Sequence, residues 1–413
     1  MRPPLPEGPY LIVGLARSGA AAARMLLPHG EVLGVDRGRA EPPPGVEVVL
    51  ESDGVELLER VRCVVKSPGV PNEAPVIVAA RERGLPVLGE LELAWRLLPG
   101  RFVAVTGTNG KTTTAELLGA IWRAAKLPVA VAGNVGTPLS SLVGEIGEEV
   151  TVVCEVSSFQ AEDSELFTPD TALLLNIEED HLDRHGTLEA YREAKLRLFR
   201  NQTPEQVAVA PAGFELPGEG RRIVFGDPAE LPLPPDEIRL RGPHNLENAM
   251  GASAAALASG VPGEAVAAAL RGFTGVPHRL EEVGTVGGVL YVNDSKATNV
   301  ASARRALESF DGGVHAILGG SLKGGGFDEL REPVAERCRA CYLIGEAAAP
   351  LAEDLEGTVP LLRSGDLENA VRDATEAAVA GDVVLLSPAC ASFDQFRDFE
   401  DRGERFRSLV PRA

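Results

Sequence analysis

The 413-residue sequence predicts an α/β protein of three consecutive blocks, each built on a mainly parallel β-sheet covered by helices. Three observations support this fold class. Short apolar runs alternate with longer segments of helical pattern along the whole chain. Hydrophobic residues make up 44% of the sequence, which is enough for packed cores. The length agrees with two to four domains of about 150 residues each.

The first block combines a strand–helix–strand pattern with a glycine-containing turn at residues 14–19. Its apolar runs lie at residues 10–13, 31–35 and 63–65. This pattern predicts a Rossmann-like parallel sheet, and the turn is similar to a dinucleotide-binding fingerprint with Asp36 placed to take ribose hydroxyls. Ala16 replaces the glycine that lets the backbone approach a pyrophosphate. The turn therefore favours another nucleotide over NAD, and a purely structural turn stays open.

The second block carries a phosphate-loop pattern. An apolar run at residues 102–105 leads into Thr-Gly-Thr-Asn-Gly-Lys-Thr at residues 106–112, and a helical segment follows. Backbone N–H groups of such a loop wrap phosphates, and the helix N-terminus adds positive potential. Lys111 would reach the β- and γ-phosphates, and Thr112 would offer its hydroxyl to Mg²⁺. Val105 replaces the first glycine of the strict motif, so a glycine-rich turn is the alternative to the nucleoside triphosphate site that we predict.

Two further strands of this block end in polar groups. Glu155 follows the apolar run at residues 150–154, and His181 follows the run at residues 171–177. Open parallel sheets place ligands at the carboxyl ends of their strands. We expect Glu155 to bind or orient Mg²⁺, with a solvated strand end as the alternative. His181 could bind a metal or a transferred group, or could be structural.

Lys195 lies on the apolar face of a predicted helix at residues 188–199, together with Leu188, Tyr191 and Leu198. A lysine buried there must be paired, neutralised or modified, because burying a bare ammonium is unfavourable. An amine with a lowered pKa can react with CO₂ to give a carbamate, which is a carboxylate able to bind Mg²⁺. The periodicity alone favours a lysine that extends to solvent from the edge of the stripe.

The third block repeats the alternation and predicts a second doubly wound sheet. Its strands are expected at residues 289–293, 315–318, 341–344 and 383–386, and polar segments follow at residues 294–299, 319–326 and 387–396. Asn and Arg side chains at residues 242–248 and 277–279 suit purine edges and phosphate oxygens, although capped loops would fit as well. The chain has six lysines, and four of them (Lys111, Lys195, Lys296 and Lys323) lie in candidate site segments. This clustering predicts a cleft for an anionic ligand.

Composition excludes several functional classes. A net charge of −20 argues against a nucleic-acid partner, which requires cationic surfaces. The N-terminal segment lacks the pattern of a signal peptide, and no apolar stretch approaches the roughly 20 residues of a membrane span. The five scattered cysteines suit a reducing cytoplasm. Cys338 and Cys341 have C-x-x-C spacing, but no second ligand pair accompanies them, so ordinary packing is favoured over a zinc or redox site.

Taken together, these segments resemble the Mur ligase family of peptidoglycan synthesis over nearly the whole chain. The resemblance is carried by residues 106–112, 155–160, 179–184, 293–299 and 387–396. It implies three domains: a Rossmann-like UDP-binding domain at residues 1–90, a P-loop-type ATPase domain at 91–275, and a Rossmann-like amino-acid-binding domain at 276–413. It further implies ATP, two Mg²⁺ ions and a carbamylated Lys195.

The resemblance also assigns roles to individual positions. Catalytic roles fall to Lys111, His181 and Lys195, and Mg²⁺ binding falls to Thr112, Glu155, His181 and Lys195. ATP binding is implied for Gly107, Thr108, Asn109, Gly110, Lys111, Thr112, Thr113, Asn248, Arg279 and Asp294. Binding of the UDP substrate is implied for Leu15, Ala16, Asp36, Arg37, Ser67, Gly69, Asn134 and Ser157. Binding of D-glutamate is implied for Lys296, Thr298, Lys323, Ser392, Phe393 and Phe399.

The implied activity is the ATP-dependent ligation of D-glutamate to UDP-N-acetylmuramoyl-L-alanine through an acyl phosphate, by a cytoplasmic monomer without membrane insertion. Three alternatives stay open on the residues themselves. An NAD-dependent oxidoreductase would use the first block but leaves the phosphate loop unexplained. A nucleotide-hydrolysing switch or scaffold would make no bond. A folylpolyglutamate synthase would share the phosphate loop but should lack the first block and residues 387–396.

Overall fold

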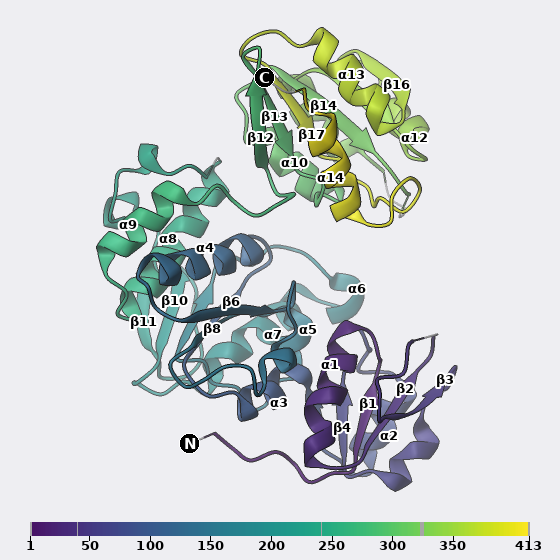
Figure 1. The fold of residues 1–413 in the computed structure, drawn as a ribbon, viewed down its shortest axis with the longest axis vertical. Helices are drawn as coiled ribbons and strands as arrows, with labels where there is room; N and C mark the ends of the chain where they lie inside the picture. The colour runs from purple at the N-terminus through teal and green to yellow at the C-terminus, as the bar shows by residue number, and fades with distance from the viewer. Residues whose placement is uncertain (1, 39, 241, 323–325, 412–413) are drawn as a thin grey trace. The chain divides into compact units, whose positions relative to one another are not determined.

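The computed structural model describes residues 2–38, 40–240, 242–322 and 326–411 (Figure 1). It confirms a mixed α/β fold with parallel sheets. The chain divides into two compact units. Unit 1 comprises Met1–Glu237 and Glu247–Gly272, and unit 2 comprises Ile238–Leu246 and Phe273–Ala413. Each of the three sheets lies within one of the predicted blocks, while the block boundaries themselves stay a prediction.

The first sheet of unit 1 has five parallel strands in the order β3-β2-β1-β4-β5. The strands are β1 (Tyr10–Val13), β2 (Val32–Asp36), β3 (Glu47–Leu50), β4 (Cys63–Lys66) and β5 (Val87–Gly89). Alternate residues of β1 face opposite sides, as the strand period requires. Tyr10 and Ile12 pack toward α1 (Arg17–Leu26) and α3 (Glu90–Leu97), whereas Leu11 and Val13 pack toward α2 (Pro75–Glu82). Both faces are thus covered, which explains why these strands are apolar throughout.

The second sheet of unit 1 has six parallel strands in the order β11-β10-β9-β6-β8-β7. They are β6 (Phe102–Thr106), β7 (Val129–Gly133), β8 (Thr151–Glu155), β9 (Thr171–Leu174), β10 (Val207–Pro211) and β11 (Arg221–Phe225). Its helices are α4 (Lys111–Ala124), α5 (Ser158–Glu162), α6 (Leu182–His185), α7 (Leu188–Arg200), α8 (Pro243–Ala258) and α9 (Gly263–Gly272). Because β6 lies between β8 and β9, the loop after β6 emerges at the point where the strand order reverses, which is where open sheets bind ligands.

Unit 2 contains a six-stranded sheet in the order β12-β13-β17-β14-β15-β16. The strands are β12 (Glu281–Val286), β13 (Val289–Asn293), β14 (Val314–Gly319), β15 (Cys338–Ile344), β16 (Leu361–Gly365) and β17 (Val383–Leu386). One face packs on α10 (Val300–Glu308), α11 (Arg331–Arg337) and α12 (Ala348–Asp354), and the other on α13 (Leu367–Ala377) and α14 (Phe399–Leu409). The sheet therefore has helices on both faces, as a doubly wound sheet does.

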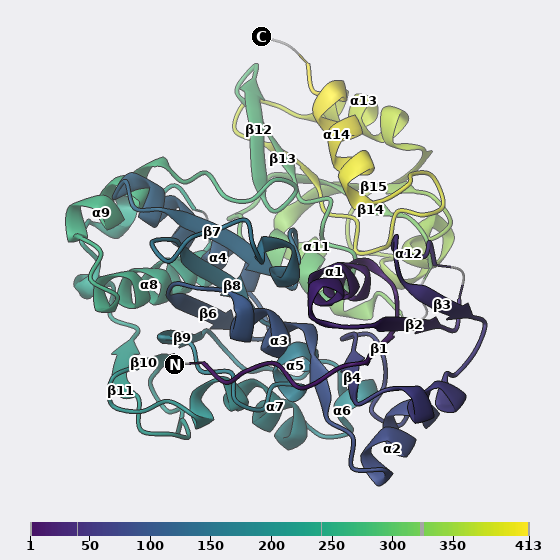
Figure 2. The ribbon, with the colours of Figure 1, turned by 60° about the horizontal axis from the view of Figure 1, so that its bottom comes forward.

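One strand of unit 2 departs from the predicted parallel pattern. β12 pairs antiparallel with β13 and forms a hairpin with it at the edge of the sheet (Figure 2). The two-residue turn consists of Gly287 and Gly288, both with positive φ (60° and 80°). Tight hairpin turns require this conformation, and glycine adopts it without strain. The strand is half-exposed and polar, so it lacks the apolar run on which the sequence prediction relied.

Within the described residues, no helix is both long enough and apolar enough to cross a membrane. All five cysteines are free thiols, and Cys341 is fully buried in β15.

A buried ion pair joins the first sheet of unit 1 to α5. Lys66 at the end of β4 donates a hydrogen bond of 2.6 Å from Nζ to Oδ2 of Asp163, and the two side chains are 0% and 2% exposed. Burial raises the pKa of the Asp163 carboxyl, and the Lys66 ammonium opposes this shift. Each charge is therefore tolerated only because the other is present.

We expect Lys66→Met to lower the free energy of unfolding by about 3–5 kcal/mol, because it leaves the Asp163 carboxyl buried without its partner. The double variant Lys66→Met/Asp163→Leu should recover most of this loss. Chemical denaturation of both variants measures the effect. Arg304→Met is the control, since it breaks an exposed pair with Glu308 that is worth less than about 1 kcal/mol. A Lys66→Met protein as stable as the wild type would contradict this view of the pair.

Candidate functional site

The loop between β6 and α4 has the backbone of a phosphate cradle. Gly110 precedes the first turn of α4 in the left-handed conformation, with φ of 81°. A Cβ atom at this position would lie 2.1 Å from Oδ1 of Asn248 in α8. Only glycine therefore fits at this point of the loop. The 14-residue helix α4 then starts at Lys111, so its unpaired N–H groups face the loop.

The loop is held in shape by residues that follow β9. The backbone oxygen of Asn176 accepts a hydrogen bond from Thr108 N (3.0 Å), and its side-chain Oδ1 accepts one from Asn109 N (2.9 Å). Glu178 accepts from Nδ2 of Asn109 (3.1 Å) and donates its own N–H to Oγ1 of Thr108 (3.0 Å). Neither Asn176 nor Glu178 is among the residues predicted from the sequence to form the site. The available signal was their polarity at the end of an apolar run.

Lys111 curls back over its own loop. Its Nζ donates hydrogen bonds to the carbonyl oxygens of Gly107 (2.9 Å) and Thr108 (2.8 Å). Thr112 and Thr113, in the first turn of α4, are both buried. A cation, helical N–H groups and hydroxyls are thus gathered in one loop, which is chemistry suited to a polyphosphate.

Lys195 is buried beneath this loop rather than extended into solvent. Its side chain is 1% exposed, Nζ donates to the Gly107 oxygen at 2.7 Å, and the ammonium lies 4.5 Å from the centre of the Tyr191 ring. The expectation from periodicity alone, a lysine reaching water, is therefore wrong. Burial, and after it the nearby Lys111 ammonium, lowers the pKa of Lys195 to about 6. Lys195 is consequently a mainly neutral amine at pH 7, which is the form that reacts with CO₂.

Tyr191 connects several of these groups. Its hydroxyl donates to Oγ1 of Thr108 at 3.2 Å, and burial raises its pKa to about 12. The His181 ring lies 6.3 Å from the Tyr191 ring and 4.8 Å from the Phe159 ring. His181 itself is half-exposed and has a left-handed backbone, with φ of 52°, at the start of α6. His181 and Lys195 therefore both lie beside Tyr191, next to the phosphate loop.

Glu155 ends β8 at the same sheet edge, where it pairs with Val105 of β6. Its side chain is 3% exposed, so the alternative of a solvated strand end is wrong. Asn134 donates two hydrogen bonds to Glu155. One runs from Nδ2 to the side-chain Oε1 (3.0 Å), and the other runs from the backbone N–H to the backbone oxygen (2.9 Å). Asn134, expected to meet the substrate, is thus also a support for the carboxylate.

The predicted Mg²⁺ ligands are of the right chemical type. Within the described residues, no three His, Cys, Asp or Glu side chains gather closely enough to hold a metal by themselves. Mg²⁺ usually takes only one or two carboxylates together with water and substrate phosphates. The Thr112 hydroxyl beside the phosphate loop and the Glu155 carboxylate offer hard oxygen ligands of this kind.

A cavity of about 510 Å³ lies at the N-terminus of α1 and brings together Leu15, Ala16 and Asp36. Asp36 accepts hydrogen bonds from Leu15 N (2.7 Å) and Gly38 N (2.8 Å), so it also shapes the turn. The Ser67 hydroxyl donates to the Gly14 oxygen at 2.6 Å and supports the turn from behind. Arg37 and Gly69 are exposed and do not line this cavity.

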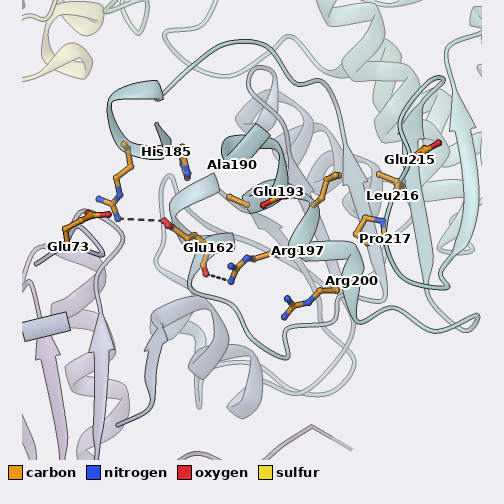
Figure 3. Close-up of a pocket in the computed structure, with 13 residues that line it drawn as sticks. Glu73, Glu162, His185, Ala190, Glu193, Arg197, Arg200, Glu215, Leu216 and Pro217 are labelled. Atoms are coloured by element: carbon orange, nitrogen blue, oxygen red, sulfur yellow. Dashed lines mark hydrogen bonds and ion pairs between the residues drawn. The ribbon is translucent and has the colours of Figure 1, made fainter. Parts of the chain in front are cut away.

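Ser157, also predicted to meet the UDP substrate, caps α5 in a reciprocal capping box with Gln160. A different face of α7 from that carrying Lys195 lines a cavity of about 710 Å³ (Figure 3). Nη2 of Arg184 lies 3.9 Å from the carboxylate oxygen Oε2 of Glu162 there. Nη1 of Arg197 donates a hydrogen bond to the backbone oxygen of Glu162 at 2.7 Å. None of the predicted site residues that the structure describes lines this cavity.

In unit 2, Asp294 follows β13 and is buried. Its carboxylate accepts hydrogen bonds from the Ser387 hydroxyl (2.8 Å) and from Leu280 N (3.1 Å). Burial raises the pKa of Asp294 to about 7, against the opposing effect of the Arg279 and Arg402 cations. Arg279 and Asp294 are thus near each other, whereas Asn248, the third residue predicted to contact the nucleoside, belongs to unit 1.

The described residues among those predicted to bind D-glutamate lie on three segments of unit 2, namely the loop after β13, the loop after β17 and the start of α14. Nζ of Lys296 is 5.1 Å from the centre of the Phe399 ring, and Thr298 donates its N–H to the Lys296 oxygen at 2.9 Å. Ser392 is buried in the loop after β17, whereas its neighbour Phe393 is 71% exposed. Lys323 lies outside the described residues.

Comparison with known proteins identifies the family of the chain. The model of the Mur ligase middle domain matches residues 105–217, and that of the Mur ligase, glutamate ligase domain matches residues 278–390. A UDP-N-acetylmuramoylalanine–D-glutamate ligase from Acidobacterium capsulatum is 43% identical, with 97% of this chain and 95% of the relative aligned. The ligase of the same name from Koribacter versatilis is 41% identical, over 97% of this chain and 96% of the relative.

Solved structures share the fold. The MurF ligase of Thermotoga maritima, determined in complex with ADP, matches with a TM-score of 0.60 at 22% identity, over 98% of this chain and 94% of that one. The UDP-N-acetylmuramate–alanine ligase of the same organism matches with a TM-score of 0.58 at 18% identity, over 97% and 99% of the two chains.

Asp294 should make the stability of unit 2 depend on pH. Its pKa is about 7 in the folded chain against an ordinary value of 3.8, so the folded state holds a proton that the unfolded state loses between these values. The free energy of unfolding of unit 2 therefore falls as pH rises from about 4 to 7. Above pH 7 Asp294 is ionised in both states and causes no further decrease. We expect Asp294→Asn to raise the unfolding midpoint of unit 2 at pH 8 and to change it little at pH 4.

Thermal unfolding between pH 4 and 8 measures this difference. Asp311→Asn, at an exposed position of the same unit, should give parallel curves for variant and wild type. An Asp294→Asn protein that is less stable than the wild type at pH 8 would show that hydrogen bonds, and not burial of the charge, dominate at this position.

Proposed function

Because the chain belongs to the Mur ligase family, we propose that it joins D-glutamate to UDP-N-acetylmuramoyl-L-alanine, with hydrolysis of ATP to ADP and phosphate. The observation that carries this proposal is the phosphate loop with Lys195 buried against it, in a chain that is 43% identical to a ligase named for this reaction. The reaction belongs to peptidoglycan precursor synthesis. We further propose that the protein works in the cytoplasm as a monomer.

In unit 1, residues 107–113 bind the phosphates of ATP, with Lys111 moving from the loop carbonyls to the β- and γ-phosphates. The fixed loop, the start of α4 and the Lys111 cation support this assignment. Asn248 of unit 1, and Arg279 and Asp294 of unit 2, are further residues that we propose to bind the adenosine and phosphate groups. Thr112 and Glu155 hold one Mg²⁺, which when bound neutralises phosphate charge.

Lys195, as a carbamate, and His181 hold the second Mg²⁺. The support for the carbamate is the burial of Lys195 and its pKa of about 6, since CO₂ adds only to the neutral amine. In that addition the neutral amine nitrogen forms a bond to the carbon of CO₂ and releases one proton to water, so that a negatively charged carbamate replaces the amine. The added carboxylate would give the buried side chain a negative charge beside the Lys111 cation.

The nucleotide sugar occupies the cavity at α1, where Leu15, Ala16 and Asp36 meet the uridine nucleotide. Arg37, Ser67 and Gly69, which do not line the cavity, are further residues that we propose to contact the nucleotide. Asn134 and Ser157 contact the muramoyl-alanine. D-Glutamate binds to unit 2 through Lys296, Thr298, Lys323, Ser392, Phe393 and Phe399. Lysine and hydroxyl groups suit the two carboxylates of this amino acid.

We propose two chemical steps. The alanyl carboxylate first attacks the γ-phosphorus of ATP, which gives an acyl phosphate and ADP. Lys111 reduces the repulsion between the two anions that must meet. The neutral amine of D-glutamate then attacks the acyl carbon, the C–O bond to phosphate breaks, and the amine proton is lost. His181 orients the transferred group.

Phosphate release tests this function. ATP, Mg²⁺ and UDP-N-acetylmuramoyl-L-alanine are supplied with D-glutamate, L-glutamate or neither. We expect release that requires the nucleotide sugar and D-glutamate together, with a product of matching mass. Release with a different amino acid would keep the ligase chemistry but replace the acceptor. Phosphate release that does not depend on the nucleotide sugar would overturn the proposal.

Lys195→Arg should lower kcat at least 100-fold, because arginine cannot form a carbamate and remains charged. Wild-type activity should fall in CO₂-depleted buffer and return with bicarbonate. Lys126→Arg, at an exposed lysine, is the matched control and should retain activity. A carbamate carbon signal from ¹³C-bicarbonate should be present in the wild type and absent from Lys195→Arg. If both proteins give the same spectrum, Lys195 is not the carbamylated group.

A further inference from the structure

Arg402 is a buried cation that none of the roles above uses. It lies on α14, is 0% exposed, and is the largest fully buried side chain in the described part of the chain. Burial lowers its pKa to about 10, so the guanidinium stays charged at neutral pH. An arginine in such a place must have its N–H groups satisfied by well-placed acceptors.

The acceptors of Arg402 come from two separate loops. Nε donates to Oγ of Ser295 (3.0 Å), and Nη2 donates to the Ser295 backbone oxygen (2.8 Å). On the other side, Nη2 donates to the oxygen of Cys390 (3.1 Å) and Nη1 to that of Ala391 (3.2 Å). The planar guanidinium thus joins α14 to the loop after β13 and to the loop after β17.

Two further contacts make this junction rigid. The Ser295 hydroxyl, which accepts from Arg402, donates to the backbone oxygen of Phe399 at 2.8 Å. The neighbour of Arg402 is Gly403, where a Cβ atom would lie 2.1 Å from Nδ1 of His278. Helix α14 can therefore approach the His278 ring this closely only with glycine at that position, next to Arg402.

The three joined segments carry the groups proposed to hold the amino acid. Ser295 directly precedes Lys296, Ala391 directly precedes Ser392, and Phe399 starts α14. The Lys296 ammonium lies over the Phe399 ring at 5.1 Å, so these segments already meet. The spacing between a lysine on one loop and a serine on the other is set by the side chain that both loops bind.

We propose that Arg402 is a positioning residue that fixes the distance between Lys296, Ser392 and Phe399 and thereby sets the affinity of the enzyme for its amino-acid substrate. This inference rests on the proposed function. Arginine suits the role because its donors diverge in a rigid fork and reach acceptors on two sides. Lysine has the same charge, but all its donors are on one atom, so it cannot hold both loops in the same geometry.

A purely stabilising role would give a different result. Loss of stability alone reduces the fraction of active enzyme, which lowers the apparent kcat for all substrates equally and leaves each KM unchanged. Loss of positioning raises the KM for the amino acid selectively. The comparison of KM values for the three substrates separates the two roles.

The experiment compares the wild type with Arg402→Lys and Ser295→Ala in the phosphate-release assay, with each substrate varied in turn. We expect the KM for D-glutamate to rise roughly tenfold in Arg402→Lys and about threefold in Ser295→Ala, since each loses hydrogen bonds that fix the pocket. The KM values for ATP and the nucleotide sugar should stay within about twofold. Unfolding midpoints of all variants identify any loss of folded protein.

Arg405→Ala is the matched control, because Arg405 lies on the same helix but is exposed and pairs with Glu368 of α13. It should leave all three KM values unchanged. An unchanged KM for D-glutamate in Arg402→Lys, with kcat lowered in proportion to folded protein, would overturn the inference while the proposed function stands. A wild type without D-glutamate-dependent phosphate release would instead overturn the proposed function, and this inference with it.

Discussion

The hydrogen bond from Lys195 to the Gly107 backbone oxygen is the contact around which the phosphate loop of unit 1 is arranged. The loop can receive it because β6 lies between β8 and β9, so that residues 107–110 leave the sheet where the strand order reverses. Glu155 ends the strand on one side, and Asn176 and Glu178 follow the strand on the other. A parallel sheet thus supplies the loop with neighbours from both sides, which no isolated strand–loop–helix segment could do.

Among the described residues, the basic side chains of Lys66, Lys195 and Arg402 are fully buried, and each is accommodated in a different way. Lys66 is neutralised by a carboxylate at 2.6 Å. Lys195 has no such partner at hydrogen-bond distance among the described contacts, and its ammonium form is disfavoured so that it tends to lose its proton. Arg402 keeps its charge and distributes it over carbonyl and hydroxyl oxygens. The first solution serves stability, the second creates a reactive amine, and the third fixes loop geometry.

Much of the fold could be predicted from the sequence because strands buried on both faces are apolar along their whole length. The runs at residues 10–13 and 383–386 coincide with β1 and β17. Edge strands escaped prediction: β16 reads Leu-Leu-Arg-Ser-Gly and β12 is half-exposed, so neither has an apolar run. The phosphate loop was recognisable because its chemistry is local. The burial of Lys195 and the junction made by Arg402 were not, since the Lys195 acceptor lies 88 residues away in the chain and one of the two loops that Arg402 joins lies 107 residues away.

Phe393 offers a contrast with Arg402 that bears on how the two positions can vary in evolution. A phenylalanine that is 71% exposed contributes little to folding, so substitutions at this position, which we propose to contact the amino acid, act mainly through ligand binding. A substitution of Arg402 affects both the folding of unit 2 and the geometry of the proposed pocket. Position 393 is therefore free to drift when a lineage changes its acceptor, whereas position 402 is held by two requirements at once. Sequence variation at the exposed aromatic should record substrate history more faithfully than variation at any buried residue of the pocket.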